Sequence, residues 1–378
     1  MLFLTLSQNL REMSLSKAEL SRYSRHIKLN GVGISGQEKL KAAKVLVIGA
    51  GGLGCPVLQY LSAAGVGTIG ILDGDKVDES NLQRQVLFAQ ADIDAPKAKT
   101  AALKLKAQNP NVNFKVANTN VTTENILSLI EYFDIIVDCT DNFPTRYLIN
   151  DACILKDKPL VFGAIHQFDG QVSVFNYKNG PSYRCLFPEA PSDVPNCSEA
   201  GVIGVLPGII GTIQANEVIK IILEIGDVLT GKLLSLNALN YEFSIIEFDK
   251  TEESNITKLG DYDFNCETTQ QNLPKSITAE ELAEMLQSTT KINILDVREY
   301  FEWDICHIQG ASNIPMNLID ECIDEVSNEI PTVVVCHHGV RSMNVIHYLE
   351  VKGYTKLINL EGGIHAWATQ VDTEMTTY

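Results

Sequence analysis

The 378-residue sequence lacks the features that mark several large classes of proteins. No apolar run reaches the roughly 20 residues that a membrane-spanning helix needs. The apolar start, residues 1–6, is short and has no basic segment before it, unlike a signal peptide. Basic residues are few: 30 Lys and Arg stand against 47 Asp and Glu, for a formal net charge of −17. We therefore expect no membrane partner, and no nucleic-acid partner either, because phosphate contacts need clustered cations.

Cysteine is also sparse for a disulfide-stabilised protein. Nine cysteines in a chain of this length do not form the dense framework of small secreted domains. This usage predicts a reducing compartment, the cytoplasm, in which some thiols are free to do chemistry.

Short apolar runs alternate with helical stretches in the first part of the chain. The expected strands are residues 45–48, 70–72, 112–118 and 135–139, separated by helices at 56–64, 96–108 and 123–132. This alternation predicts an α/β fold with a doubly wound, mostly parallel sheet. Further strands are expected at 160–163, at 171–177 and within 233–248.

A polar stretch interrupts the apolar patterns and indicates a linker. We predict a first domain over residues 1–250, with a disordered start at 1–13, a linker over 251–275 and a smaller α/β domain over 276–373. Translation from Met1 or from Met13 is equally compatible with this division.

A glycine-rich turn follows the first expected strand and opens a helix. Its glycines are Gly49, Gly51, Gly52 and Gly54. Glycines at this place let the backbone approach phosphates, and a helix N-terminus favours negative charge. Asp73 ends the next strand, where a carboxylate binds ribose hydroxyls in dinucleotide-binding proteins. By itself this pattern fits an NAD or FAD oxidoreductase.

Charged residues further along favour ATP over NAD. A polar cluster follows Asp73 and contains Ser80, Asn81, Leu82, Gln83 and Arg84. Lys97 begins a helix, and Asp141 and Asn142 follow another strand. Hydride transfer needs no pair of cations, whereas attack on ATP does, because charge builds on the leaving phosphates. An aspartate at this edge of a sheet, Asp141, is well placed to hold Mg²⁺.

These motifs resemble those of the MoeB/ThiF family of adenylyltransferases. The resemblance covers roughly residues 14–250 and includes residues 22–27, Asp73 to Asp75 and Pro96. The resemblance implies a Rossmann-like domain that adenylates the C-terminal glycine of a ubiquitin-like sulfur carrier. The implied ATP-binding residues are the four glycines, Asp73, Asp75, Ser80 to Arg84, Lys97, Asp141 and Asn142. It also implies a homodimer, because Arg25 matches an arginine that reaches the nucleotide of the partner subunit.

Two groups of cysteines in this domain bear on its chemistry. Cys197 lies in a stretch rich in Pro, Asp and Ser, as expected for a surface loop. The resemblance implies that Cys197 bonds to the sulfur of the thiolated carrier. Two Cys-x-x-Cys pairs hold a structural zinc in the family, but here only Cys185 and Cys266 remain near their places. Because structural zinc needs four good ligands, we predict no zinc site.

A second motif begins after an expected strand in the smaller domain. Cys336 is followed by His337, His338, Gly339, Val340 and Arg341, before an expected helix. Such a loop aims backbone N–H groups at the sulfur, which stabilises an anionic persulfide. Four residues separate Cys336 from Arg341, whereas a phosphatase loop would need five. With flanking motifs around Asp296, His307 and Gly362, the loop resembles a rhodanese domain, in which Cys336 carries persulfide sulfur.

The sequence therefore predicts an enzyme with coupled adenylyltransferase and sulfurtransferase activities. Its catalytic residues would be Arg84, Asp141, Cys197 and Cys336. Its partners would be the carrier and a persulfide donor, in molybdopterin synthesis or, alternatively, in thiamine-thiazole synthesis. Two different hypotheses also fit the motifs: a carrier-binding scaffold without activity, and an NAD-dependent oxidoreductase fused to a rhodanese.

Overall fold

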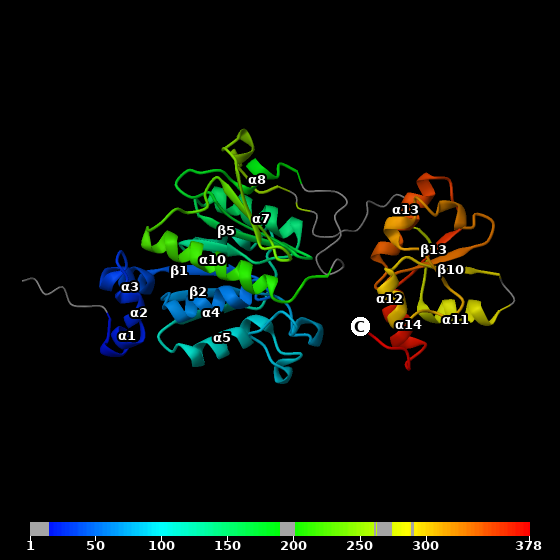
Figure 1. Cartoon of the computed structure of the whole chain (residues 1–378), viewed down its shortest axis with the longest axis horizontal. Helices are drawn as coiled ribbons and strands as arrows, with labels where there is room; N and C mark the ends of the chain where they lie inside the picture. The colour runs from blue at the N-terminus through cyan, green and yellow to red at the C-terminus, as the bar shows by residue number, and fades with distance from the viewer. Residues whose placement is uncertain (1–14, 190–200, 261, 263–273, 289–290) are drawn as a thin grey trace, which may run out of the picture. The chain divides into compact units, whose positions relative to one another are not determined.

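The computed structural model describes residues 15–189, 201–260, 262, 274–288 and 291–378. The predicted disordered start, Cys197 and Cys266 lie outside these residues. The chain divides into two compact units at residue 264, and each is described by itself (Figure 1).

An eight-stranded sheet with the order β3-β2-β1-β4-β5-β6-β7-β8 forms the centre of the first unit. Strands β1 to β5 are parallel, and β5 to β8 pair antiparallel. The strands are β1 (Lys44–Ile48), β2 (Thr68–Leu72), β3 (Asn113–Ala117), β4 (Ile135–Asp138), β5 (Leu160–His166), β6 (Asp169–Phe175), β7 (Lys232–Asn237) and β8 (Glu242–Glu247). The predicted doubly wound, mostly parallel sheet is confirmed.

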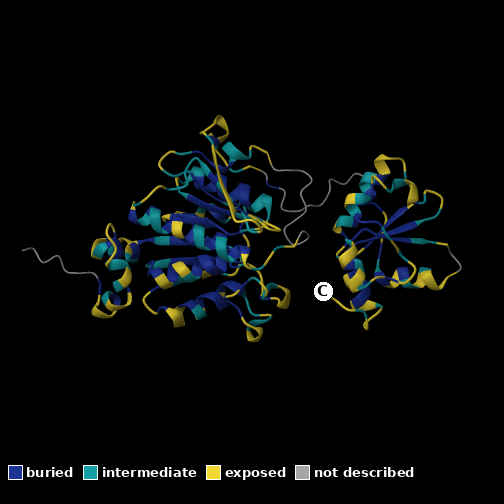
Figure 2. Cartoon of the chain, in the orientation of Figure 1, coloured by how far each residue is buried: buried dark blue, intermediate teal, exposed yellow. Residues whose placement is uncertain are grey.

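Helices cover both faces of this sheet, as its apolar runs require. They are α1 (Lys17–Arg22), α2 (Ser24–Ile27), α3 (Gly33–Ala42), α4 (Gly54–Ala64), α5 (Lys97–Gln108), α6 (Ile126–Glu131), α7 (Phe143–Leu155), α8 (Tyr183–Leu186) and α10 (Leu206–Leu223). Val45 and Val47 of β1 belong to the hydrophobic cluster on the face covered by α4, α5 and α10. Leu46 and Ile48 belong to the hydrophobic cluster on the opposite face, covered by α6 and α7. The central strands β1, β2 and β4 are therefore buried on both faces (Figure 2).

Helix α10 is the one described helix that is long and apolar enough to cross a membrane. In this chain 56% of that stretch is buried. It packs against α4 and β5, so it serves as a central helix of the first unit.

The order of the strands reverses at β1, which pairs with β2 on one side and β4 on the other. In open α/β sheets, ligands bind in the crevice beyond the carboxyl ends of the strands at such a reversal. The loops after β1, β2 and β4 meet at this edge, and they contain most of the predicted ATP-binding residues.

The stretch after residue 250 belongs in part to the first unit. Ser254, in a short 3₁₀ helix at Glu252–Ser254, is buried. Tyr262 is buried as well, and its hydroxyl donates a 2.5 Å hydrogen bond to Asp151 Oδ2 on α7. The sequence analysis ended the first domain at residue 250. The first unit of the structure extends beyond that residue.

A five-stranded parallel sheet with the order β11-β10-β12-β13-β9 forms the centre of the second unit. Its strands are β9 (Ser276–Ile277), β10 (Asn293–Asp296), β11 (Ser312–Asn313), β12 (Thr332–Val335) and β13 (Leu357–Leu360). Its helices are α11 (Ala279–Gln287), α12 (Tyr300–Ile305), α13 (Val340–Val351) and α14 (Gly363–Gln370). Val333 and Val335 pack with residues of α11 and α14, whereas Val334 packs with residues of α13.

Candidate functional site

The glycine turn is held in one tight conformation between β1 and α4. Gly49 has a φ of 94°, which favours glycine. A Cβ atom on Gly54 would lie 2.0 Å from the carbonyl oxygen of Gly49, so no other residue fits at the start of α4. The turn therefore brings backbone close to the carboxyl edge of the sheet, where the N-terminus of α4 points its free N–H groups.

Asp73 fixes this turn from the end of β2. Its Oδ2 accepts a 2.7 Å hydrogen bond from the N–H of Ala50, and its Oδ1 accepts a 2.8 Å bond from the N–H of Asp75. Burial raises the pKa of Asp73, and these two hydrogen bonds work in the opposite direction. The predicted ribose-binding residue is thus also the residue that ties the glycine turn to β2.

The predicted polar cluster lies over the glycine turn. A Cβ atom on Gly52 would lie 3.7 Å from Cδ of Arg84, so the arginine stem runs beside this glycine. Arg84 Nη1 donates a 3.0 Å bond to the carbonyl of Ser80, whose hydroxyl donates to Asp78. The other members of the cluster contact neighbouring residues. Asn81 Nδ2 donates a hydrogen bond to Ser80 Oγ, Leu82 packs against the hydrophobic core and Gln83 contacts Gly204.

Lys97 places a second cation at this edge. Its ammonium group lies 3.1 Å from Asp75 Oδ2, and its side chain is buried while that of Asp75 is 68% exposed. The Lys97 N–H also donates to the Asp75 carbonyl. A surface carboxylate thus holds the Lys97 ammonium group in place at the edge of the sheet that carries the glycine turn.

Asp141 and Asn142 follow β4 at the same edge but differ in their contacts. Asn142 caps α7, since its Oδ1 accepts a 3.0 Å bond from the Thr145 N–H. Asp141 is exposed, and within the described residues no hydrogen bond or ion pair holds its carboxylate. Behind them, Oδ2 of the buried Asp138 lies 3.5 Å from Nε of Arg146. The Asp141 carboxylate is thus free to coordinate a hard cation such as Mg²⁺.

The structure does not bring Arg25 to these residues. Arg25 is exposed on α2, which packs against α3 at the amino end of β1. The preceding Tyr23 is fixed there by Asn109, whose Nδ2 donates a 2.9 Å bond to the tyrosine hydroxyl. Arg25 therefore lies at the end of the sheet opposite to the glycine turn of its own chain.

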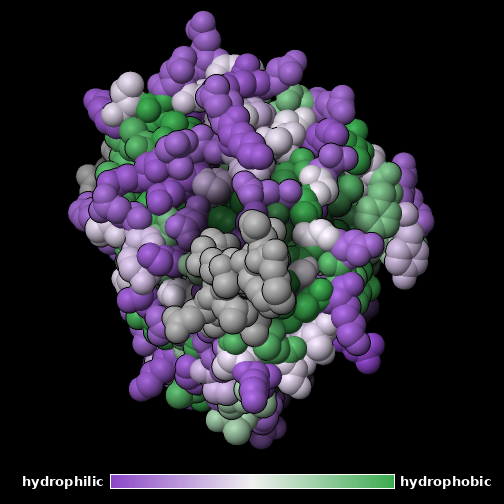
Figure 3. All heavy atoms as spheres, turned by 90° about the vertical axis from the view of Figure 1, so that its left-hand side faces the viewer, coloured by the Kyte–Doolittle hydropathy of each residue, from purple (hydrophilic) through white to green (hydrophobic). Residues whose placement is uncertain are grey.

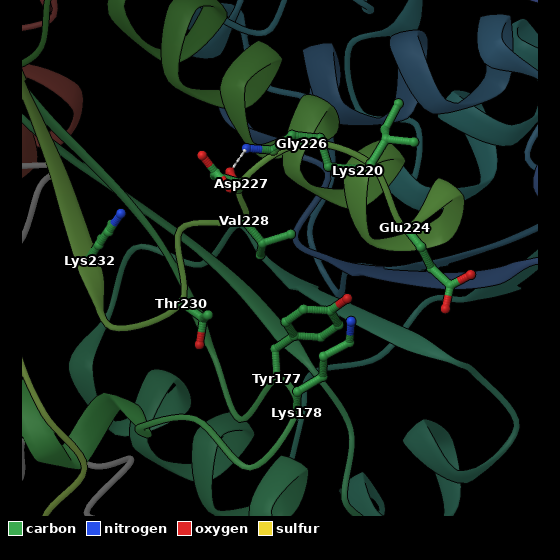
Figure 4. Close-up of a pocket in the computed structure, with 10 residues that line it drawn as sticks. Tyr177, Lys178, Lys220, Glu224, Gly226, Asp227, Val228, Thr230 and Lys232 are labelled. Atoms are coloured by element: carbon green, nitrogen blue, oxygen red, sulfur yellow. Dashed lines mark hydrogen bonds between the residues drawn. The ribbon is translucent and has the colours of Figure 1, made fainter. Parts of the chain in front are cut away.

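A hollow of about 350 Å³ near the end of α10 contains none of the predicted residues (Figure 4). Lys220 on its rim donates a hydrogen bond to the Asp227 carbonyl and pairs with Glu217. The glycine turn, with its backbone donors and two nearby cations, is the better candidate for a nucleotide.

Cys185, which the sequence places at the first of the two expected pairs of zinc ligands, has serine hydroxyls and a backbone N–H as partners. Ser254 Oγ lies 2.8 Å from its sulfur and Ser182 Oγ 3.5 Å, and the Thr251 N–H donates at 3.3 Å. The sequence placed the second pair of ligands near Cys266, but the structure places Thr251 and Ser254 beside Cys185. Burial acts to raise the Cys185 pKa, yet these hydrogen bonds outweigh it and lower the pKa to about 7.

The Cys336 loop forms a cradle around the sulfur between β12 and α13. Cys336 is buried, and the Gly339 N–H donates a 3.0 Å hydrogen bond to its Sγ. Gly339 has a φ of 96°, and a Cβ there would lie 3.2 Å from the Leu360 carbonyl oxygen. Ser342, which the sequence did not single out, places its hydroxyl 3.3 Å from the same sulfur. The Gly339 N–H is thus the donor held on the sulfur, because the single hydroxyl proton of Ser342 has a closer acceptor in Asn359 Oδ1, at 2.6 Å.

The other predicted members of the cradle have different surroundings. Arg341 forms a bidentate ion pair with Glu302, in which each of its two terminal nitrogens lies 2.7 Å from a carboxylate oxygen. Val340 is exposed. The rings of His337 and His338 lie against each other, with centroids 4.2 Å apart.

Sequence reasoning also missed Tyr378, whose ring packs edge-on against His337. Its hydroxyl accepts a 2.7 Å bond from Arg298 and donates a 3.1 Å bond to Glu302. No local signal connects Tyr378 with Glu302, because the chain brings them together only in the folded unit.

The fold and the sites define a nucleotide-binding α/β enzyme joined to a sulfurtransferase-type domain. Residues 23–258 match the ThiF family and residues 278–370 match the rhodanese-like domain. The chain is 42% identical over 380 residues to a probable adenylyltransferase/sulfurtransferase, MoeZ, of Mycobacterium tuberculosis, covering 97% of each chain. It is 37% identical to the adenylyltransferase and sulfurtransferase MOCS3 of Culex quinquefasciatus, covering 96% of this chain and 90% of that protein.

The chain therefore belongs to the ThiF family, carries a rhodanese-like domain, and is an enzyme of the adenylyltransferase and sulfurtransferase type. Solved structures support the fold of the first unit. The crystal structure of E. coli MccB with MccA-N7isoASN has a TM-score of 0.57 at 21% identity, covering 65% of this chain and 76% of that chain. The MccB structure with ATP has a TM-score of 0.54 at 18% identity, covering 64% of this chain and 82% of that chain.

Proposed function

We propose that this enzyme uses ATP to adenylate the C-terminal glycine of a ubiquitin-like sulfur carrier, and that Cys336 supplies the sulfur that converts it to a thiocarboxylate. The observation that carries this proposal is the presence of two complementary sites in one chain. One offers backbone donors, Arg84 and Lys97 to a triphosphate; the other offers the Gly339 N–H to an anionic sulfur. We assign the carrier to molybdopterin synthesis, and place the reaction in the cytoplasm.

The adenylation site fits its substrate by charge. The carrier carboxylate attacks the α-phosphorus of ATP, and pyrophosphate leaves with the electron pair of the broken P–O bond. Arg84 and Lys97 stabilise the charge that builds on this leaving group. Asp141, exposed and without a partner among the described residues, would hold Mg²⁺, which neutralises phosphate charge when bound. The product is an acyl-adenylate, an anhydride reactive toward sulfur.

Arg25 supports a homodimer in this proposal. Its side chain is exposed at the amino end of the sheet, so it can serve a nucleotide only on another copy. The end of the unit that carries α1 to α3 mixes hydrophilic and hydrophobic side chains (Figure 3), and Leu29 and Ile34 of this segment are exposed. Apolar side chains around a cation are suited to an interface between two copies.

An exposed apolar surface supports a protein substrate. The hairpin of β7 and β8 exposes more than half of Leu239, Tyr241, Phe243 and Ile245. Strand β8 is the edge of the eight-stranded sheet. Such clusters on a folded protein mark interaction sites, and we assign this one to the carrier.

Sulfur transfer then joins the two sites. A persulfide donor places a sulfur on Cys336, and the terminal sulfur attacks the acyl-adenylate carbonyl while AMP leaves. The carrier is then bonded to Cys336 through an acyl disulfide. Cys197 attacks the carrier sulfur of this acyl disulfide and releases the Cys336 thiolate, so the carrier is then bonded to Cys197 through an acyl disulfide. An external thiol attacks the Cys197 sulfur and releases the carrier thiocarboxylate, and a second thiol then reduces the mixed disulfide and restores Cys197.

ATP–pyrophosphate exchange with purified carriers tests the proposal. We expect exchange that requires a molybdopterin-type carrier with an intact terminal glycine. Exchange only with a thiamine-type carrier would move the enzyme to the thiazole branch. Binding of a carrier without any exchange would support a non-catalytic scaffold and contradict the proposal.

A further inference from the structure

Three histidines meet beside the Cys336 loop. His337 and His338 lie in the loop, and His365 lies in the first turn of α14. One ring nitrogen from each histidine lies within 4.8 Å of those of the other two. The sequence shows only the adjacent pair, which by itself is more often exposed than metal-binding; the third imidazole comes from another element.

Backbone hydrogen bonds hold the loop and α14 together at this point. The N–H of Ile364 donates a 2.8 Å bond to the Cys336 carbonyl, and the N–H of His365 donates a 3.2 Å bond to the His337 carbonyl. The three imidazoles are therefore carried on a fixed backbone, and only their side-chain rotations remain to be adjusted. A preorganised set of ligands is the arrangement that metal binding favours.

The chemistry of these ligands selects the ion. Imidazole nitrogens suit zinc, copper and nickel, whereas magnesium and calcium require oxygen. His338 and His365 are exposed, which lets an ion enter from solvent.

We propose that His337, His338 and His365 form a site for a divalent transition-metal ion, with zinc as the representative ion. Three protein ligands leave the fourth position of a tetrahedral ion open. Two of the three ligands, His338 and His365, are exposed to solvent, so binding is reversible.

Metal titration of the full-length protein tests the site without any reaction. After treatment with a chelator, the protein is titrated with Zn²⁺ by calorimetry and with Co²⁺ by visible absorption. We expect His365→Gln and His338→Gln to weaken this site at least about tenfold, since even the loss of a group that only orients a ligand costs roughly 10–100-fold. His307→Gln, an exposed histidine of the same unit, is the matched control and should leave affinity unchanged.

Two further results decide the proposal. Cys336→Ser should keep the affinity, and the Co²⁺ spectrum should lack a thiolate charge-transfer band. Equal affinity in the wild type and His365→Gln, or an equal loss in Cys336→Ser, would overturn the imidazole site.

Discussion

The main-chain N–H of Gly339 donates a 3.0 Å hydrogen bond to the sulfur of Cys336, at the start of α13. A donor fixed in this position stabilises sulfur with negative charge. We therefore expect Cys336→Ala to abolish sulfur transfer to cyanide and to the carrier while leaving carrier adenylation unchanged. Thiosulfate-to-cyanide transfer and ATP–pyrophosphate exchange, measured on one preparation, separate the two effects.

Cys197→Ala is the complementary change. If Cys197 acts only on the acyl disulfide, this variant should retain both half-reactions and slow only thiocarboxylate formation, measured by mass spectrometry of the carrier. Loss of cyanide-dependent transfer in Cys197→Ala, with normal transfer in Cys336→Ala, would show that the two roles are reversed.

Asp141→Ala should slow pyrophosphate exchange by about 10²-fold or more, the usual effect of removing one preorganised electrostatic contact. Because Asp141 is exposed and not hydrogen-bonded within the described residues, its loss should leave the melting temperature nearly unchanged. Arg84→Ala should have a similar effect on exchange. Near-normal exchange in a folded Asp141→Ala protein would remove this residue from the ATP site.

Mixing two inactive variants tests the proposed exchange of Arg25 between subunits. Arg25→Ala and Asp141→Ala should each lack adenylation as homodimers. In a mixed dimer, one site combines an intact Asp141 with the partner's intact Arg25. Random exchange of subunits should therefore restore roughly a quarter of the wild-type rate. No recovery, with subunit exchange verified by native mass spectrometry, would show that Arg25 acts within its own chain or not at all.

Much of the fold could be predicted from short apolar runs. Val45 to Ile48 and Thr332 to Val335 are buried on both faces of their sheets, and this burial leaves a continuous apolar run in the sequence. Strands β9 and β11 were missed because two residues carry no periodicity. Helix α7 was missed because its face toward the protein includes the polar Asn150 and Asp151, which bind Tyr183, Arg184 and Tyr262.

The site was predictable where one local motif contains it, as in the glycine turn and the Cys336 loop. It was not predictable where residues distant in the sequence meet. Arg341 belongs to the Cys336 motif, but the sequence could not show that it pairs with Glu302 on α12. The sequence likewise could not show that His365 lies near His337.

The low pKa of Cys185 predicts a specific pH dependence of its reactivity. The thiolate fraction of this half-buried cysteine should rise through about pH 7, whereas an ordinary cysteine ionises near pH 9. Alkylation by iodoacetamide, followed by peptide mass spectrometry, should therefore reach half of its maximal rate near pH 7. Cys153, buried and with a raised pKa, should stay unmodified as the internal control.

Ser254→Ala tests the cause of this shift. It removes the 2.8 Å contact to the Cys185 sulfur, so the midpoint of alkylation should move to higher pH. An unchanged midpoint in the variant would show that the serine hydroxyl does not stabilise the thiolate.

The surroundings of Cys185 also predict that the first unit holds no zinc. Four side chains gather at this point, but only Cys185 is a thiol; the others are Ser182, Thr251 and Ser254. One thiolate with three hydroxyls is too weak a set to hold a structural zinc. The serines already bind the cysteine and each other, with Ser254 Oγ donating a 3.1 Å bond to Ser182 Oγ, so this network links α8 to the segment after β8 without an ion.

We therefore expect elemental analysis to find no zinc after dialysis against a chelator, and the melting temperature to be unchanged by that dialysis. The dialysis matters because the three-histidine site should release its ion, whereas a site with four thiolates would retain it. Zinc that persists at one ion per chain in His365→Gln, and is lost in Cys185→Ser, would contradict the prediction. It would show that Cys185 has thiolate partners among residues outside those described, where Cys197 and Cys266 lie.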